Sequence, residues 1–386
     1  MELYICGFNA HHQLALSSVD EFTQFHKSCR SPHLRVRCTL WSCTVVENDG
    51  SLIHNGYRLS GLDPVRIEGP PPRNIKIIFG DTSGVLGALT TDGGLYVYHD
   101  EPVETQSPEL KRHHFDEDCF ISKQNLAIDH LAVADNGEVC IITSARQRAP
   151  SGCTPVSTDE TPQFTFEAPT AKLEIHTFAC FNAFLSSDPP TSTLPVFSSI
   201  VSLLASATSF TALTTSGEVM TFGSALHPQT LGRTPGPSSP ANCPCSIPFL
   251  GGIPTRKVAV GGWIGAAVSD DNDMYVWGGQ AGDAKRIEAL PKLLDGEEVK
   301  LVDINGGVDV VDVGVGSEHI VALTGDGEVW VIGDGECGQL GTGSKAFEED
   351  WVRARGEWEG RGRVVGVGCG MWCSWILVDT KLNQVS

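Results

Sequence analysis

The stretch VGVGSEHIVALTGDGEVWVIGDGECGQLG, residues Val313–Gly341, decides the fold of this 386-residue chain. Two runs of alternating apolar residues flank the polar turn Gly325-Asp326-Gly327. An Asp-Gly step between alternating apolar residues is a strong hairpin signal, because tight hairpin turns need positive φ angles. The stretch therefore predicts two antiparallel strands followed by a glycine-rich loop.

The same unit recurs along the chain, with Ala or Val five residues before the second turn residue and an apolar residue two after it. The turn positions are 50, 93, 137, 217, 272 and 327, with a degenerate seventh at Lys381. Seven units in 386 residues give an average of about 55 residues per unit. Gly and Pro make up 64 of the residues, which also disfavours a helical fold.

The seventh unit stops half-way, at residues 364–378, and its missing half matches the start of the chain. Leu3–Leu14 aligns with Val329–Leu340, pairing Gly7 with Gly333. A circular array that completes its last unit with its first residues leaves no exposed sheet edge at the seam. We therefore predict an all-β, seven-bladed β-propeller, a single domain over residues 1–386 in which blade seven comprises residues 363–381 plus 1–16.

The pattern G-x-x-H-x-x-A-L-T-x-D-G-x-V-W-x-x-G-x-x-x-x-G-Q-L-G, at Gly316–Gly341, resembles the repeat of the regulator of chromosome condensation family. Other units keep the turn and the apolar positions, but only one keeps the histidine, His319. The resemblance implies the propeller fold. It also implies either a partner subunit without catalysis or, as in the founding member, nucleotide exchange on the small GTPase Ran.

Two segments are predicted to be loops that leave the repeat. Residues 145–195, between units three and four, are rich in Pro, Ser and Thr, and residues 227–248 form a second Pro-rich loop. Within the first, Lys172–Phe178 alternates like an outer strand. Surface excursion is the simplest interpretation, and such loops are also where a partner-specific surface can sit.

The charge balance argues against direct nucleic-acid binding, because the chain has a net charge of −20 and a phosphate-binding surface needs basic residues. Residues 1–80 are nearly neutral, with eight basic and seven acidic side chains, whereas residues 81–386 hold 19 and 40. The near-neutral first unit is a reasonable place for a protein partner to dock.

Thirteen cysteines without regular spacing, and no Asn-X-Ser/Thr acceptor, predict reduced thiols in a cytoplasmic or nuclear protein. The N-terminal segment MELYICGFNA lacks the features of a signal peptide. No apolar stretch is long enough to cross a bilayer, so we expect no membrane association.

Motifs for catalysis, cofactors and metals give no site. The sequence holds no G-x-S-x-G, H-E-x-x-H or phosphate-loop motif. The dinucleotide-like run Gly333–Gly338 is followed by turn residues instead of a helix. Metal candidates without a partner pair at zinc-ligand spacing are His113-His114 with Asp116-Glu117-Asp118, Cys243 with Cys245, and Cys369 with Cys373. We predict no catalytic residue, no cofactor and no metal.

The most informative side chains are three tryptophans. Trp41, Trp263 and Trp372 occupy the same repeat position in units one, five and seven, so we expect them on one face of the ring, with Trp41 close to Trp372. Tryptophan is enriched at the centres of protein interfaces, and we predict these three to be partner-binding residues. Packing between adjacent blades is an equally good interpretation. Trp277 and Trp330 match strand positions and are expected to be structural.

These observations favour a non-catalytic protein-interaction module, acting as a regulatory or scaffold subunit and built as a monomeric ring. Guanine nucleotide exchange on a Ran-like small GTPase is the alternative. Relatives of similar layout suggest three classes of partner: a small GTPase, a factor of tRNA or diphthamide modification, or a chromatin-modification factor.

Overall fold

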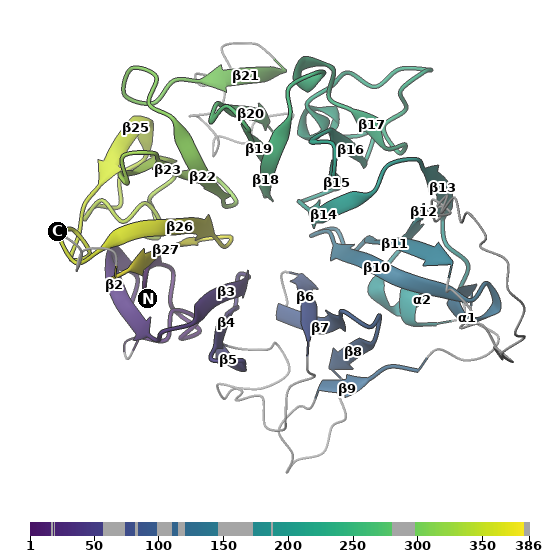
Figure 1. The fold of residues 1–386 in the computed structure, drawn as a ribbon, viewed down its shortest axis with the longest axis horizontal. Helices are drawn as coiled ribbons and strands as arrows, with labels where there is room; N and C mark the ends of the chain where they lie inside the picture. Colours follow the sequence, from purple (N-terminus) through teal and green to yellow (C-terminus); the bar gives the residue numbers. More distant parts are fainter. Residues whose placement is uncertain are drawn as a thin grey trace, which may run out of the picture.

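The computed structural model describes residues 1–16, 18, 20–56, 74–81, 84–98, 110–114, 120–145, 173–186, 188–279 and 298–381. Its strands form seven antiparallel sheets arranged around a central axis (Figure 1). The chain is therefore a seven-bladed β-propeller, and the predicted fold class is confirmed.

The strands of each blade follow one another from the innermost outward. Blade one holds β3 (Leu34–Thr39), β4 (Cys43–Asn48) and β5 (Ser51–Gly56), and blade two holds β6 (Ile75–Asp81), β7 (Gly84–Thr90), β8 (Leu95–Tyr98) and β9 (Leu110–Arg112). Blade three holds β10 (Leu126–Val133), β11 (Val139–Ala145), β12 (Leu173–Phe178) and β13 (Ser192–Val196). Blade four holds β14 (Ile200–Ala205), β15 (Ser209–Thr214), β16 (Val219–Gly223) and β17 (Cys245–Ser246).

The remaining blades repeat this order. Blade five holds β18 (Thr255–Gly261), β19 (Ile264–Ser269), β20 (Met274–Gly278) and β21 (Val299–Val302), and blade six holds β22 (Val310–Val315), β23 (His319–Thr324), β24 (Val329–Gly333) and β25 (Glu348–Ala354). Blade seven holds β26 (Arg363–Cys369), β27 (Cys373–Asp379), β1 (Glu2–Gly7) and β2 (Phe22–Arg30). The short helices are α1 (Phe120–Lys123), α2 (Phe181–Leu185), η1 (Pro228–Leu231) and η2 (Pro248–Leu250).

Blade seven joins the two ends of the chain, because β1 lies between β27 and β2. Leu3 pairs with Leu377 across the seam. The blade extends to Arg30, beyond the expected limit at residue 16, because its outermost strand starts only at Phe22. Both sides of β1 are thereby hydrogen-bonded, and the seam has no open edge in this blade.

The N-terminal segment reproduces the geometry of the blade-six segment with which it aligns. Gly7 and Gly333 both have left-handed backbones, with φ angles of 110° and 108°. The side-chain oxygens of Gln13 and Gln339 each accept a hydrogen bond from the backbone N–H two residues earlier, at 3.0 and 2.8 Å. The alignment of residues 3–14 with residues 329–340 is therefore confirmed.

The Asn136-Gly137 turn lies in a different place from the other unit turns. It connects β10, the innermost strand of blade three, to β11, whereas the Asp326-Gly327 turn connects the second and third strands of blade six. The prediction that these turns are equivalent is wrong. Both are tight turns with the same backbone hydrogen bonds, and the Asp/Asn-Gly signal marks a tight turn without saying which strands it joins.

Residues 145–195 contribute structure to blade three. The expected outer strand is confirmed as β12, and β13 adds a fourth strand whose Thr193 pairs with His176. Residues 146–172 of this segment lie outside the described part of the chain. The 80-residue spacing between units three and four thus includes the two outer strands of blade three.

Apolar side chains fill the spaces between neighbouring blades. One such cluster joins Val276 and Ile304 of blade five to Val313 and Ile320 of blade six. With the blades fixed in this way, the loops between their first and second strands all meet at one end of the central channel. We call this end the Trp41 face. Within the described ranges, no helix is long and apolar enough to cross a membrane.

Candidate functional site

All three predicted tryptophans lie in loops between first and second strands. Trp41 is between β3 and β4, Trp263 between β18 and β19, and Trp372 between β26 and β27. They are therefore on the Trp41 face, as the repeat alignment predicts. Each is half-buried.

Trp41 and Trp372 meet at the junction of blades seven and one, as expected. Their ring centroids are 6.1 Å apart, with the rings nearly perpendicular. Phe8 completes the group at 5.6 Å from Trp372 and 6.4 Å from Trp41, and the His11 ring lies 4.9 Å from Trp41. We call Phe8, His11, Trp41 and Trp372 the aromatic cluster. All four side chains are half-buried, so they both pack at the seam and contribute to the surface.

Trp263 has a different neighbour. Its ring lies 4.7 Å from that of His227, at the junction of blades four and five. His227 follows Gly223 by four residues, as His11 follows Gly7 by four. The same His-Trp pair thus occurs at two junctions, each time between the loop after a third strand and the first loop of the next blade. This repetition supports a packing role for Trp263.

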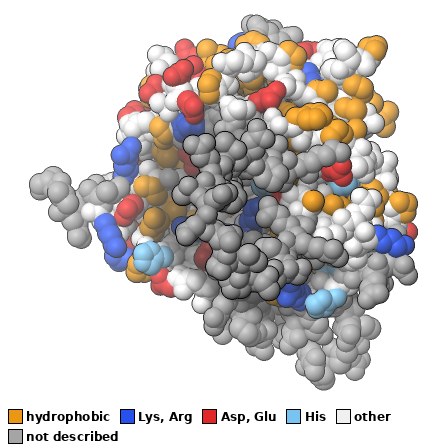
Figure 2. Space-filling view, turned by 45° about the vertical axis from the view of Figure 1, so that its right-hand side comes forward, with side chains coloured by type: hydrophobic (Ala, Val, Ile, Leu, Met, Phe, Trp, Pro, Cys, Tyr) orange, Lys and Arg blue, Asp and Glu red, His pale blue; other side chains and the backbone are white. Residues whose placement is uncertain are grey.

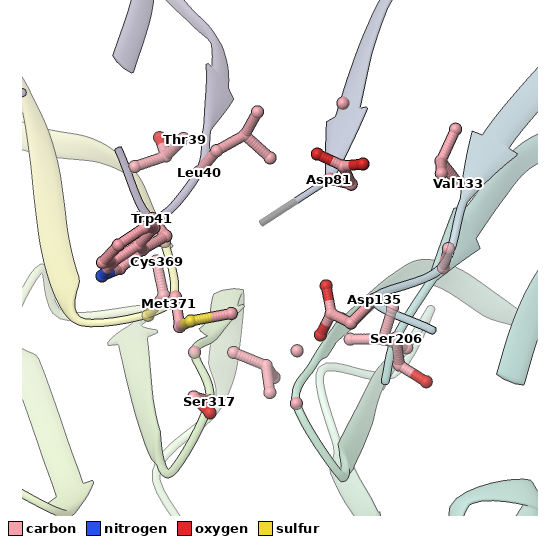
Figure 3. Close-up of a pocket in the computed structure, with 18 residues that line it drawn as sticks. Thr39, Leu40, Trp41, Asp81, Val133, Asp135, Ser206, Ser317, Cys369 and Met371 are labelled. Carbon is pink, nitrogen blue, oxygen red and sulfur yellow. The ribbon is translucent and has the colours of Figure 1, made fainter. Parts of the chain in front are cut away.

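The central channel opens on the Trp41 face in a cavity of about 140 Å³, which we call the channel mouth. It is lined by the ends of the innermost strands and the loops that follow them (Figure 3). Asp81 and Asp135, from blades two and three, and Met371 from blade seven project toward this space (Figure 3). The mouth adjoins the aromatic cluster through Trp41, which lines it.

The electrostatics of the mouth are those of two neighbouring carboxyl groups. Desolvation by the surrounding blades raises the pKa of Asp135, and repulsion from the Asp81 carboxylate raises it further. Sequence reasoning missed both acids and Met371. These three side chains lie at or beside the loops between first and second strands. The repeat alignment predicts where those loops are, but it does not predict the direction in which their side chains point.

Hydrogen bonds between first loops fix the rim of the mouth. The N–H of Asp135 donates to Ser206 O at 3.2 Å, that of Ala207 donates to Gly262 O at 2.8 Å, and that of Ser317 donates to Met371 O at 3.0 Å. Each bond crosses from one blade to the next. These bonds tie the first loops of neighbouring blades to one another at the mouth.

The Pro-rich segment 227–248 is folded onto blade four by Arg233, which is only 2% exposed. Its terminal nitrogens donate to Thr221 O, Pro240 O and Cys243 O at 3.0 to 3.1 Å, and to both Ser239 oxygens at 2.8 Å. The fully buried Trp277 donates from Nε1 to Thr230 O at 3.1 Å, which agrees with its predicted structural role.

Figure 2 shows hydrophobic, acidic, basic and polar side chains on this side of the molecule, with several hydrophobic ones close together at the upper right. The channel mouth and the aromatic cluster differ from the rest of the surface in their geometry. Together they bring aromatic rings and carboxyl groups from several blades to one place.

Two of the three metal candidates, Cys243 with Cys245 and Cys369 with Cys373, lie in the described part of the chain. Cys373 is buried, and desolvation raises its pKa to about 12, so its thiol stays protonated. Asp116-Glu117-Asp118 lies outside the described residues. In the part of the chain that the structure covers, no group of three or more His, Cys, Asp or Glu side chains is placed to hold a metal ion.

Comparison with known proteins agrees with the fold. A model described as "Regulator of chromosome condensation (RCC1) repeat" matches residues 310–339. The human E3 ubiquitin-protein ligase HERC2 is 38% identical over 135 residues, which is 34% of this chain and 3% of HERC2. The chain thus spans a small fraction of this relative.

Solved structures match over nearly the whole chain. Human WBSCR16 superimposes with a TM-score of 0.63 at 15% identity, covering 98% of this chain and 99% of that one. Prp20p from Saccharomyces cerevisiae gives 0.51 at 13% identity, covering 99% and 93%. Fold and repeat together define an RCC1-like β-propeller. The repeat match and the superpositions support an RCC1-like protein, with the repeat matched at residues 310–339 and the fold matched over nearly the whole chain.

Proposed function

We propose that this chain is a non-catalytic regulatory or scaffold subunit that binds a protein partner through its Trp41 face. The RCC1-like propeller fold and repeat support a protein-interaction or regulatory module. The observation that carries the finer proposal is the aromatic cluster beside the channel mouth. It places half-buried aromatic rings, the type of side chain enriched at interface centres, on a rigid surface.

The test is affinity capture with the tagged full chain, comparing wild type with the double variant Trp41→Ala/Trp372→Ala. Phe197→Ala is the matched control, because Phe197 is 93% exposed and precedes β14, at the opposite end of the ring from the Trp41 face. We expect the double variant to lose a partner that wild type and Phe197→Ala both retain, with all three folded by circular dichroism. Identical capture by all three folded proteins contradicts the proposal.

Nucleotide exchange on a Ran-like GTPase is the second candidate function. The structural neighbour Prp20p binds Gsp1p and histones, and the Asp81 and Asp135 carboxylates give the Trp41 face an acidic centre. Release of mant-GDP from Ran separates the two candidates. Acceleration by micromolar protein supports exchange, and an unchanged release rate rejects it for Ran.

A further inference from the structure

Among the described residues that line the channel mouth, the only charged side chains are acidic. Its eighteen described lining residues come from all seven blades and include two acids, Asp81 and Asp135, but no Lys, Arg or His. A concave site lined by one sign of charge attracts the opposite sign, because the surrounding protein focuses the field. The mouth therefore favours a cationic group.

Asp135 is the better placed of the two acids. Its backbone is fixed on the rim by the bond from its N–H to Ser206 O, and the neighbouring N–H of Asn136 donates to Ala207 O at 3.0 Å. Asp135 is an exposed residue and lines the mouth. Among the described residues, no hydrogen bond or ion pair uses its carboxylate. Both oxygens are therefore available as acceptors for a cation that enters the channel.

The rest of the mouth suits the stem of a long side chain. Trp41 and Met371 form apolar walls on the side opposite Asp135 (Figure 3). Lys and Arg side chains combine an apolar stem with a charged end, and a guanidinium is attracted to the face of a tryptophan ring. The volume of about 140 Å³ is similar to a cavity of about 150 Å³ that admits benzene, so one side chain fits.

We propose that the channel mouth is a docking pocket for one lysine or arginine side chain of the protein partner, with its charged end at Asp135 and Asp81 and its stem against Trp41 and Met371. This inference rests on the proposed function, because it assigns the chemistry of the partner that binds the Trp41 face. Charge complementarity selects a cationic segment over an anionic one, and the net charge of −20 acts in the same direction at longer range.

The probe for this pocket is a fluorescein-labelled hexaarginine peptide, titrated with the full chain at low ionic strength and followed by fluorescence anisotropy. The test variant is Asp81→Asn/Asp135→Asn, which is nearly isosteric and removes two like charges. The matched control is Asp270→Asn/Asp271→Asn. This control changes the net charge by the same amount. Its two positions are exposed and follow β19, at the opposite end of the ring from the channel mouth. We expect Kd to rise at least tenfold for the test variant and less than twofold for the control.

A second pair of variants leaves both carboxylates in place. Met371→Lys supplies the mouth with a cation from within the chain and is expected to weaken the peptide at least tenfold, whereas Met371→Leu is expected to bind like wild type. Equal Kd changes in the two double-Asn variants, or wild-type binding by Met371→Lys, overturn the inference. Either result leaves the proposed partner role to be decided separately, by capture with the Trp41→Ala/Trp372→Ala variant.

Discussion

His319 Nε2 in blade six lies 2.9 Å from Ser374 Oγ in blade seven. The Ser374 hydroxyl donates its only hydrogen to Gln339 O at 2.7 Å, so Oγ accepts from His319, and Nε2 carries the hydrogen of the neutral ring. This chain of bonds connects blades six and seven in the interior, where His319 is 1% exposed.

Because the His319 ring is buried and neutral in the folded protein, we expect the protein to lose stability in mild acid. Burial lowers the pKa of His319 from 6.5 to about 4. Between these values the unfolded chain binds the proton and the folded chain does not, so stability is complete above pH 6.5 and falls as the pH decreases toward 4. The full effect of this one group is about 3 kcal/mol.

Thermal unfolding at pH 7 and pH 5 measures this effect in wild type and in His319→Gln. We expect the variant to be less stable at pH 7 but to lose less stability between pH 7 and pH 5. An equal loss in both proteins shows that His319 is not a source of the acid sensitivity.

Because blade seven joins the two ends of the chain, we expect the stability of the whole ring to depend on the N-terminal strand β1. Removal of residues 1–16 deletes β1, which pairs with β27 on one side and β2 on the other, and exposes the edge of β27. We expect a lower melting temperature with loss of β-sheet circular dichroism. A truncated protein that melts at the wild-type temperature contradicts the seam assignment.

Gly7 is predicted to be intolerant of a side chain. A Cβ atom there would lie 2.4 Å from Trp372 O, and the φ angle is 110°. Gly50 is the matched control, since it also has positive φ (80°) but open space around the Cβ position. Gly50→Ala is expected to cost about 1–2 kcal/mol, the cost of the backbone conformation alone, and Gly7→Ala clearly more. Urea unfolding compares them, and equal losses would show that the close approach to Trp372 is unimportant.

Arg233 is predicted to fix the Pro-rich segment. Arg233→Gln removes donors from carbonyls in a nearly buried site, and an unmade buried hydrogen bond costs about 1–3 kcal/mol. We expect a lower melting temperature and faster proteolytic cleavage within residues 234–244. Arg363→Gln, at an exposed position in β26, is the control and should change neither. Cleavage of Arg233→Gln at the wild-type rate indicates that other contacts hold the segment.

Sequence periodicity predicted the blades in which the tight turn of the unit joins the second strand to the third, as in the Val313–Gly341 unit. It failed in blade three because a tight Asn-Gly turn has the same local signal wherever it occurs. The closeness of Trp41 and Trp372 followed from ring closure, which is a property of the repeat. The positions of Phe8, His11 and Asp135 depend on loop conformation. A comparison of Gly7–His11 with Gly223–His227 would have revealed the His-Trp pairs.

Binding of a partner at the Trp41 face is the central claim, and site-specific photo-cross-linking tests it most directly. The photoreactive residue p-benzoylphenylalanine replaces Trp41 in one protein and Phe197, at the opposite end of the ring, in another. The aromatic replacement retains much of the packing at position 41. We predict a discrete cross-linked partner from position 41 and none from position 197. The same cross-linked species from position 197, with none from position 41, would contradict the account.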